Sequence, residues 1–207
     1  MNPNIKKLLI LNNHGFTDQG MIHLLNLVSL EQLDLRGELL TLIGFERIAG
    51  LRNLKSLEFL QATQLDNQGL ARLATLPQLK SLTFFSQGVT TSGVTQLKSL
   101  NDLVKFEAEG ARPDGTVLDI SALSQLETLK ISPVSDDDLA CLEGLKSLKW
   151  LEIGGPGLTN KGLNHLRSLL CLRVLKVWPE NQVTEDALKA LGRDRPSLRW
   201  EQIRSAP

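Results

Sequence analysis

The sequence has no excess of charge of either sign. Its 207 residues contain 23 Lys and Arg against 23 Asp and Glu, so the formal net charge is zero. Proteins dedicated to nucleic acids or acidic membranes need clustered Lys and Arg, which displace counterions from phosphates. We therefore expect neither a nucleic acid nor a membrane as the partner.

Cysteines and long apolar segments are also scarce. Cys141 and Cys171 are too few for a disulfide scaffold and lack the spacing of metal ligands, which fits a reducing compartment. No segment approaches the roughly 18 uninterrupted apolar residues of a membrane span. The apolar run at residues 8–11 is too short for a signal peptide. These absences predict a cytoplasmic location.

A tandem repeat fills most of the chain. The unit Leu-x-x-Leu-x-Leu recurs every 22 to 25 residues, which is typical of a solenoid. An earlier copy begins at Ile5, and a degenerate last copy lies around Leu198 and Trp200. We expect a single domain over residues 1–207, with repeats that open near residues 5, 30, 54, 79, 103, 126, 148 and 172 and a degenerate cap over 192–207.

The second half of each unit has helical spacing, whereas the first half alternates like a strand. Six residues stand where a side-chain oxygen would cap a starting helix: Thr17, Asp66, Thr90, Ser135, Thr159 and Thr184. The acidic residues Asp18, Asp136 and Glu185 follow such caps and suit the positive end of a helix. Glycine recurs at one position, where a missing side chain would let the helix lie close to its neighbour: Gly20, Gly69, Gly93 and Gly162.

With these motifs, the sequence resembles leucine-rich-repeat proteins of the subclass with a helical convex side, found in ribonuclease-inhibitor-like and F-box-associated arrays. The resemblance covers residues 5–203. It implies an α/β leucine-rich-repeat solenoid of about eight repeats, with a curved, parallel concave β-sheet and helices on the convex side. It also implies recognition of another protein through the concave sheet. In the unit from Leu103, residues 111–116 replace the usual turn, so we expect a local bulge there.

The outward positions of each strand form columns across neighbouring repeats, because side chains alternate between the two faces. The fifth-position column reads Leu9, Asp34, Glu58, Thr83, Glu107, Lys130, Glu152, Lys176 and, in the last unit, Arg199. From Glu107 onward the signs alternate, which predicts a self-compensating charge ladder, with a role in partner recognition as the alternative. Asp34 and Glu58 lack such compensation in their column, although Arg36 is near, and would suit a basic partner.

Large apolar residues occupy several other outward positions. Trp150, Val174 and Trp178 come from two adjacent repeats and are predicted to form one patch, and Leu60 and Phe85 are predicted to form another. Exposed apolar patches commonly mark interfaces, and Trp is enriched among their strongest contacts. In the alternative interpretation, the two tryptophans pack over the sheet edge, over Pro179 or under the last cap. Trp200 falls at an inward position and is expected in the core.

The sequence presents no assembled catalytic or metal site. His14, His23 and His165 are the first suspects near neutral pH, but they form no motif, and the last two lie in different repeats. The acidic run at residues 136–138 lacks the ligand spacing of a calcium loop and is better explained as a helix start. We therefore expect no enzyme activity, no cofactor and no metal.

The leading functional hypothesis is a non-catalytic module that binds a protein through its concave sheet, with an inhibitor or immunity-type factor as one form. The predicted binding residues are Trp150, Val174, Trp178, Leu60, Phe85, Asp34 and Glu58. One alternative is a structural protein that self-associates through its first repeat, because Ile5 opens the array with an exposed strand edge. Another is a secreted effector.

Overall fold

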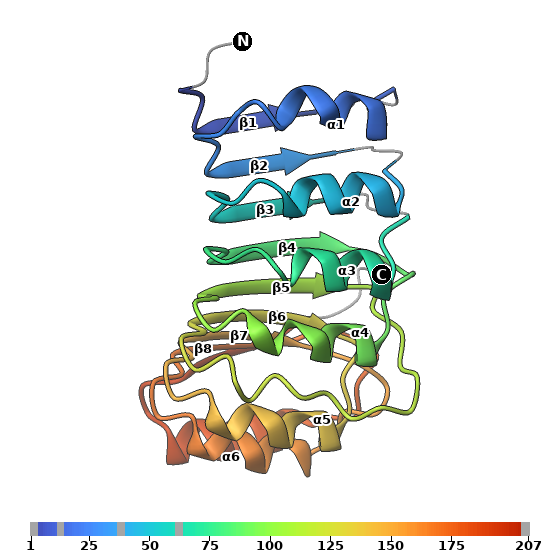
Figure 1. Ribbon diagram of the computed structural model, residues 1–207. Coiled ribbons are helices and arrows are strands. Elements are labelled where there is room, and N and C mark those ends of the chain that lie inside the picture. Colours follow the sequence, from blue (N-terminus) through green and yellow to red (C-terminus); the bar gives the residue numbers. More distant parts are fainter. Residues whose placement is uncertain (1–3, 12–14, 37–39, 61–63, 204–207) are drawn as a thin grey trace.

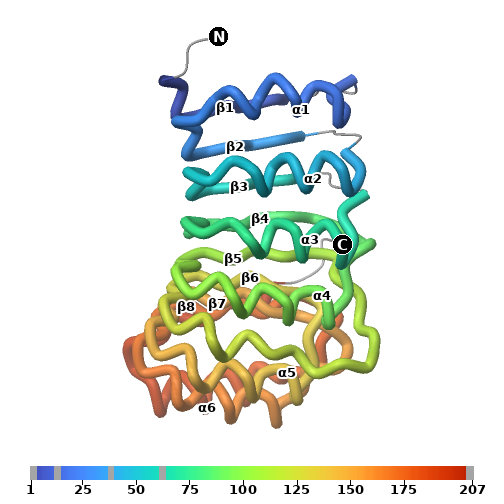
Figure 2. Tube along the Cα trace, viewed as in Figure 1, coloured from blue at the N-terminus to red at the C-terminus, as the bar shows by residue number. Residues whose placement is uncertain are grey.

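A computed structural model describes residues 4–11, 15–36, 40–60 and 64–203. The chain coils so that each repeat adds one strand to a single sheet and returns along the opposite side (Figure 2). The helices lie together on one face of the sheet, and the strands stack in chain order (Figure 1). The other face of the sheet is the concave face, which no described helix covers.

Within the described residues, nine parallel strands form the sheet in the order β1 to β9. Their bounds are β1 (Lys7–Ile10), β2 (Gln32–Leu35), β3 (Ser56–Phe59), β4 (Ser81–Phe85), β5 (Lys105–Glu109), β6 (Thr128–Ser132), β7 (Trp150–Ile153), β8 (Val174–Val177) and β9 (Arg199–Gln202). Each of β1 to β8 begins two residues after a predicted repeat start. The predicted fold, a leucine-rich-repeat solenoid with a parallel concave sheet, is confirmed.

The convex side carries short helices. The α-helices are α1 (Asp18–Leu24), α2 (Leu42–Ala49), α3 (Asn67–Leu73), α4 (Thr91–Thr95), α5 (Asp136–Ala140) and α6 (Glu185–Asp194). The 3₁₀-helices are η1 (Gln96–Ser99), η2 (Cys141–Gly144) and η3 (Gly162–Ser168). They are short because each must fit between one strand and the next within a repeat of about 24 residues.

The core is one continuous stack of leucines between the sheet and the helices. Residues that alternate along each strand, such as Leu57 and Leu82, are fully buried, and so are helix residues such as Leu70 and Leu139. Burying one leucine contributes about 2 kcal/mol, and each repeat buries its leucines against those of the repeats beside it. The fold is therefore held by contacts between neighbours.

A second set of contacts joins neighbouring repeats at the helix starts. A side chain at or just before the helix start accepts a hydrogen bond from the backbone N–H of the next repeat's capping residue. The bonds run from Thr41 N to Asp18 Oδ1 (3.0 Å), Thr90 N to Asn67 Oδ1 (2.9 Å), Thr159 N to Asp136 Oδ1 (2.7 Å) and Thr184 N to Asn160 Oδ1 (2.8 Å). Asp18 and Asp136 therefore bridge repeats, a role beyond the predicted match to the helix dipole.

Asp136 illustrates how these bridges affect ionisation. Burial of its carboxyl raises the pKa, but the two hydrogen bonds that Thr159 donates outweigh burial and hold the pKa below its ordinary value. Its neighbour Asp138 forms a capping box with Ser135. The predicted explanation of the acidic run as a helix start is confirmed.

The predicted caps are only partly formed. Asp66, Ser135 and Thr184 accept hydrogen bonds from their own helix starts, as expected. Thr17 and Thr90 make no such bond. The Thr90 hydroxyl instead donates to Asp114 in the next repeat, at 2.6 Å. Contacts between repeats thus compete with capping inside a repeat.

The recurring glycines make room for the bridging side chains. A Cβ atom at Gly93 would lie 2.1 Å from Asn67 Oδ1, and one at Gly162 would lie 2.5 Å from Asp136 Oδ1. The expected close approach of neighbouring helices is therefore found at these positions. Gly20 differs, because a Cβ atom there would meet the ring of Phe16 in its own repeat, at 2.7 Å.

The unit from Leu103 is irregular in the segment where a local bulge was expected. Residues 110–127, all of which the structure describes, contain no helix. Strand β5, which precedes this segment, pairs in continuous register with β4 and β6. Pro113, and Gly115 at φ +82°, do not favour a helix. Hydrogen bonds from Ser92 and Thr90 hold the pKa of Asp114 below its ordinary value and fix this extended segment.

The last repeat is aligned differently from the prediction. Arg199 pairs with Val174 and Glu201 pairs with Lys176, so Glu201, and not Arg199, continues the fifth-position column. Trp200 lies opposite Leu175 and packs against the core, as expected. Helix α6 continues through Gly192 to Asp194, so it extends into the segment that was predicted as the cap. Of the predicted cap over 192–207, residues 204–207 lie outside the described residues.

We predict that Gly93→Ala lowers the free energy of unfolding by about 1–3 kcal/mol relative to Gly144→Ala. Both substitutions add a methyl group to a short helix. The new methyl at residue 93 would collide with Asn67, whose amide Thr90 holds by two hydrogen bonds, whereas the nearest atom to a Cβ at Gly144 is 3.6 Å away. Urea denaturation measures the difference, and equal stability of the two variants would contradict the bridging role of Asn67.

Candidate functional site

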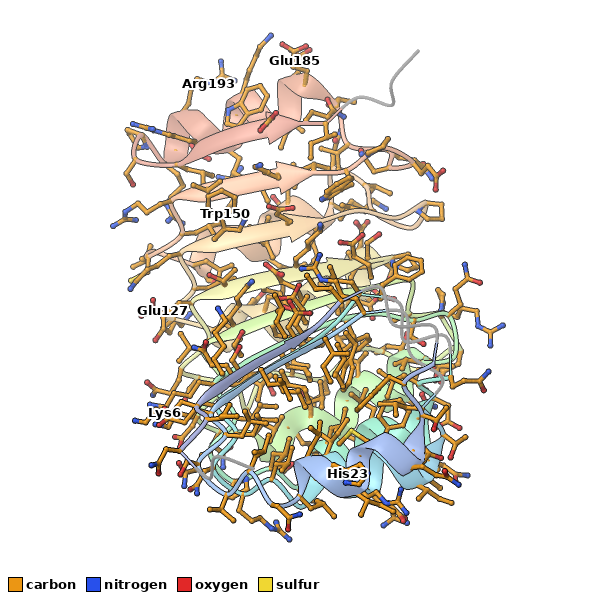
Figure 3. The ribbon with its side chains drawn as sticks, turned by 90° about the horizontal axis from the view of Figure 1, so that it is seen from above. Lys6, His23, Glu127, Trp150, Glu185 and Arg193 are labelled. Atoms are coloured by element: carbon orange, nitrogen blue, oxygen red, sulfur yellow. The ribbon has the colours of Figure 1, made fainter. Side chains whose placement is uncertain are left out.

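The concave face is built from the outward side chains of nine strands in one register. The pairing of β5 to β9 places the fifth-position residues in one row: Glu107, Lys130, Glu152, Lys176 and Glu201. Neighbouring residues in such a row are about 4.8 Å apart, so their side chains interact directly. Figure 3 shows Trp150 among the strands of this half of the sheet, far from Lys6 and His23.

Glu152 is the centre of a cluster on the concave face. Trp150 Nε1 donates a hydrogen bond to Glu152 Oε1 at 2.8 Å, and Trp178 Nε1 donates one to Oε2 at 3.2 Å. Lys130 Nζ and Lys176 Nζ lie 3.9 and 4.0 Å from the same carboxylate. We call these five residues the Glu152 cluster. Because the Glu152 side chain is only 13% exposed, these four partners compensate its lost hydration.

The two lysines of the cluster also cover the two tryptophans. Lys130 Nζ lies 4.6 Å from the centroid of the Trp178 ring, and Lys176 Nζ lies 5.1 Å from that of Trp150. Each distance is within the range of a cation–π interaction. Each indole is therefore held by a hydrogen bond to Glu152 and by a lysine, so both rings are fixed in place.

Trp178 reaches the cluster because the neighbouring strand leaves a gap. Gly154 occupies the equivalent position after β7, and a Cβ atom there would lie only 2.7 Å from Trp178 Cβ. The indole therefore extends over β7 towards Lys130 on β6. Val174 pairs directly with Trp150, so the structure brings together all three residues of the first predicted patch.

The predicted charge ladder is present from Lys130 to Glu201. Glu152 lies between Lys130 and Lys176, and Lys176 Nζ is also 3.8 Å from Glu201. At its start the ladder differs from the prediction, because Glu107 pairs with Lys105 of its own strand at 3.0 Å. Lys130 forms its shortest ion pair, 2.6 Å, with Glu109.

Asp34 and Glu58 are less isolated than their column suggested. Arg36 contacts both carboxylates, with Nη2 lying 3.3 Å from Asp34 Oδ2 and 3.6 Å from Glu58 Oε1. One guanidinium therefore pairs with two carboxylates.

Phe85 and Leu60 lie on neighbouring strands. The register of β3 and β4 ends with Phe59 opposite Phe84, which places Leu60 beside Phe85. Phe85 is 45% exposed, whereas Leu60 is half-buried. A Cβ atom at Gly110 would be 3.5 Å from Phe85 Cε2, so this ring lies beside the end of β5, where glycine leaves space.

A hollow of about 200 Å³ lies on the concave face between Phe85 and Trp178. It is lined by Phe85, Glu109, Gly110, Lys130, Ser132, Glu152, Trp178, Pro179 and Glu180. Neither Glu109 nor Glu180 was predicted from the sequence as a site residue. Gly154 was the available signal, because a glycine at this position lets Trp178 lie over the neighbouring strand.

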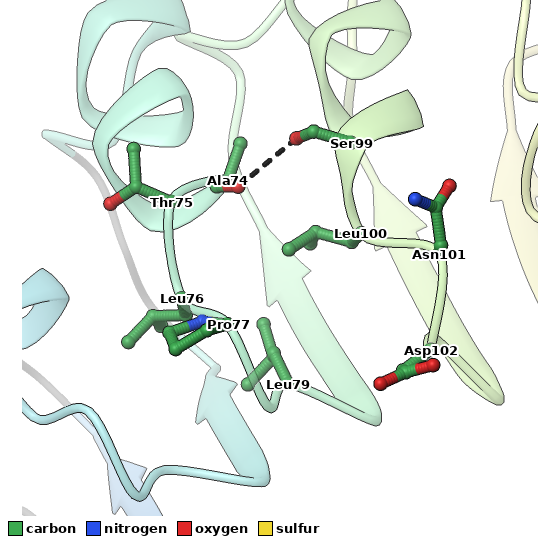
Figure 4. A pocket seen from close by; sticks show the side chains of 9 residues that line it. All are labelled: Ala74, Thr75, Leu76, Pro77, Leu79, Ser99, Leu100, Asn101 and Asp102. Atoms are coloured by element: carbon green, nitrogen blue, oxygen red, sulfur yellow. Dashed lines mark hydrogen bonds between the residues drawn. The ribbon is translucent and has the colours of Figure 1, made fainter.

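A second hollow, of about 330 Å³, lies between the turns that precede β4 and β5 (Figure 4). Its lining runs from Ala74 to Leu79 and from Ser99 to Asp102, and Ser99 Oγ donates to the carbonyl of Ala74 at 3.0 Å. Asp102 is its one ionisable side chain. We assign no function to this hollow.

The histidines considered as catalytic or metal-binding candidates do not form a common site in the described part of the chain. His165 Nδ1 is 2.6 Å from Glu143 on the convex side, His23 is exposed on α1, and His14 lies outside the described residues. Within the described part of the chain, no group of three or more His, Cys, Asp or Glu side chains could hold a metal ion.

The two cysteines are free and differ in reactivity. Burial raises the pKa of the Cys141 thiol to about 11, whereas Cys171 is exposed. A thiol with so high a pKa has little thiolate at neutral pH and is a poor nucleophile.

None of the helices in the described ranges combines the length and apolar character needed to cross a membrane.

No protein-family model and no curated protein matches the chain. Solved structures do match it, among them an internalin from Listeria monocytogenes, with 17% identity and a TM-score of 0.52 over 89% of this chain and 70% of the internalin chain. The fold is a leucine-rich-repeat solenoid. A chain in the complex of yeast Rad7 and Elc1 matches with 19% identity and a TM-score of 0.49, over 91% of this chain and 60% of that one.

We predict that Glu152→Gln lowers the free energy of unfolding by about 1–3 kcal/mol, because the carboxylate accepts from two indoles and faces two lysines. Glu127→Gln is the matched control. It removes a charge whose ion pair with Lys149 is exposed to solvent, which contributes less than about 1 kcal/mol. Urea denaturation measures both values. If the two variants lose the same stability, Glu152 does not organise the cluster.

Proposed function

We propose that this chain is a non-catalytic protein-interaction module that binds a protein partner through its concave sheet. The observation that carries this proposal is the Glu152 cluster, which fixes two half-buried tryptophans on an otherwise uncovered sheet. Tryptophans contribute strongly to interfaces, and side chains already fixed in the free protein lose little entropy when they bind. A partner would therefore gain contact area at low cost.

The proposed binding residues form two regions of the concave face. Trp150, Val174 and Trp178 form the region around β7 and β8, where Trp150 and Val174 are register partners. The second region lies on β2 to β4 and contains Asp34, Glu58, Leu60 and Phe85. Its excess of one carboxylate over Arg36 suits a basic group on the partner.

An inhibitor or immunity-type factor is the specific form that we favour, because a rigid concave sheet is shaped to cover a convex surface of a folded enzyme.

One hydrophobic cluster extends from Met21 to Leu198, which supports treating residues 1–207 as a single domain. Helices on the convex side support the ribonuclease-inhibitor-like subclass. Two free cysteines are consistent with the reducing environment of the cytoplasm.

Affinity purification from native lysate tests the proposal, with tagged wild type, the Trp150→Ala/Trp178→Ala variant and Leu170→Ala compared. Leu170 is 72% exposed and precedes β8, outside the Glu152 cluster, so it is a matched control for loss of exposed apolar area. We expect a protein that wild type and Leu170→Ala retain and the double variant loses, with affinity at least about tenfold weaker by calorimetry. A partner bound equally by all three folded forms would place binding elsewhere.

Self-association through the first repeat is the second candidate function. Among the described strands, β1 pairs only with β2, so one edge of β1 is unpaired. Leu8 and Ile10 are only partly buried, although their equivalents in β2 to β8 are buried. Exposed large apolar side chains also gather in this repeat: Leu9, Leu11, Ile22, Leu25 and Val28. An open edge beside apolar surface favours pairing between chains.

We predict for this candidate that the mass of the wild-type chain rises with concentration in analytical ultracentrifugation, and that Leu9→Lys keeps the chain monomeric. Leu9 is 47% exposed on the edge strand, where a lysine opposes pairing. Ile43→Lys, at an exposed site on α2, should behave like wild type. A wild-type chain that stays monomeric over the whole concentration range would eliminate self-association.

A further inference from the structure

The hollow between Phe85 and Trp178 carries an excess of negative charge. Three carboxylates line it, those of Glu109, Glu152 and Glu180, against the single ammonium of Lys130. Ser132 and the backbone at Gly110 add neutral polar groups. Aromatic walls with carboxylates between them attract a cation through both the ring faces and the charges.

Lys130 shows that the hollow already accommodates one cation. Its Nζ lies 2.6 Å from Glu109 Oε1 and 4.6 Å from the centroid of the Trp178 ring. The same Nζ lies 3.9 Å from Glu152, so Lys130 would keep an ion pair with Glu152 if Glu109 paired with another cation. The chain's own ammonium therefore displays the contacts that a partner's cation would make.

Capacity for a second cation remains after Lys130 is counted. Glu180 makes no hydrogen bond or ion pair with any residue that the structure describes, and the Glu109 side chain is 44% exposed. Glu152, by contrast, is fully engaged by the two tryptophans and two lysines. Glu109 and Glu180 are the carboxylates that a ligand can reach.

Phe85 supplies a surface on which a planar cation can stack. It is 45% exposed on the concave face. A guanidinium stacks on an aromatic ring while its five N–H groups donate to carboxylates in the same plane. An ammonium has only three N–H donors and no planar face to stack on a ring, so the site favours arginine over lysine.

We propose that this hollow receives an arginine side chain of the protein partner, an inference that rests on the proposed function. The guanidinium stacks on Phe85 and donates hydrogen bonds to Glu109 and Glu180, while Lys130 keeps its ion pair with Glu152. With the arginine in place, the hollow still carries one excess negative charge, since three carboxylates face two cations.

An acidic side chain of the partner suits the site less well. The two lysines that it would need are already paired, Lys130 with Glu109 and Glu152, and Lys176 with Glu152 and Glu201. An incoming carboxylate would also meet Glu180.

NMR titration with blocked tripeptides tests the inference directly. The probes are acetyl-Gly-Arg-Gly-amide and its citrulline counterpart, which keeps the shape of the side chain but carries no charge. We expect the arginine peptide to shift the indole Nε1–H resonance of Trp178 with a Kd of about 1 mM, and the citrulline peptide to bind at least about tenfold more weakly.

Substitutions in the hollow should then change the affinity for the arginine peptide in opposite directions. Glu109→Gln and Phe85→Leu each weaken binding by about tenfold. Lys130→Gln strengthens it, because it removes a competing cation from the same carboxylates. Glu127→Gln, outside the hollow, leaves the affinity unchanged. Equal binding of the two peptides, or weaker binding by Lys130→Gln, would overturn the proposal.

The outcome separates this inference from the proposed function. If a partner is lost by Trp150→Ala/Trp178→Ala but binds Glu109→Gln and Phe85→Leu as tightly as wild type, the concave face is the binding surface and the arginine site is wrong. If an acetyl-Gly-Glu-Gly-amide peptide shifts Trp178 instead, and Lys130→Gln abolishes that shift, the hollow binds an acidic group. If the arginine peptide binds as expected while the partner binds the double variant as tightly as wild type, the site stands and the concave-face function fails.

Discussion

The structure depends on one constraint, which is that a repeat can bury its leucines only against the repeats beside it. The inward residues of β1 to β8 satisfy this constraint by stacking in a single parallel register. On the convex side, Asp18, Asn67 and Asp136 extend the same register by accepting the backbone N–H of the following repeat. Gly93 and Gly162 are the positions where these bridges leave no room for a side chain. The spacing between neighbouring repeats is thus set by leucine burial along the strands and by hydrogen bonds at the helix starts.

The same register determines which side chains are neighbours on the concave face. Glu152 contacts Lys130 and Lys176 because the three residues share one row across β6, β7 and β8. A slip of β7 by one residue would turn Glu152 into the core and Leu151 outward, since side chains alternate along a strand. The cluster is therefore a product of core packing. Its rigidity follows, because a tryptophan that left Glu152 would remove a hydrogen bond from a nearly buried carboxylate.

Much of this arrangement could be predicted from sequence, because the repeat spacing determines both strand positions and outward columns. The starts of β1 to β8 and the row from Glu107 to Lys176 followed directly. The last repeat was misaligned, since one leucine and Trp200 do not define a register, and Glu201 took the place expected for Arg199. Contacts that a side chain makes across a neighbouring strand could not be predicted from the sequence. The indole of Trp178 crosses β7 only because residue 154 is glycine, and Arg36 bridges two strands by the reach of its own side chain.

The central claim is that the tryptophans of the concave face are fixed before any partner binds. Solvent exchange of the indole Nε1–H groups, measured by NMR on the free chain, tests it most directly. We expect the groups of Trp150 and Trp178 to exchange much more slowly than a free indole, because both donate to Glu152. Exchange as fast as that of a free indole would show that the rings move independently of Glu152, and would contradict a preformed binding surface.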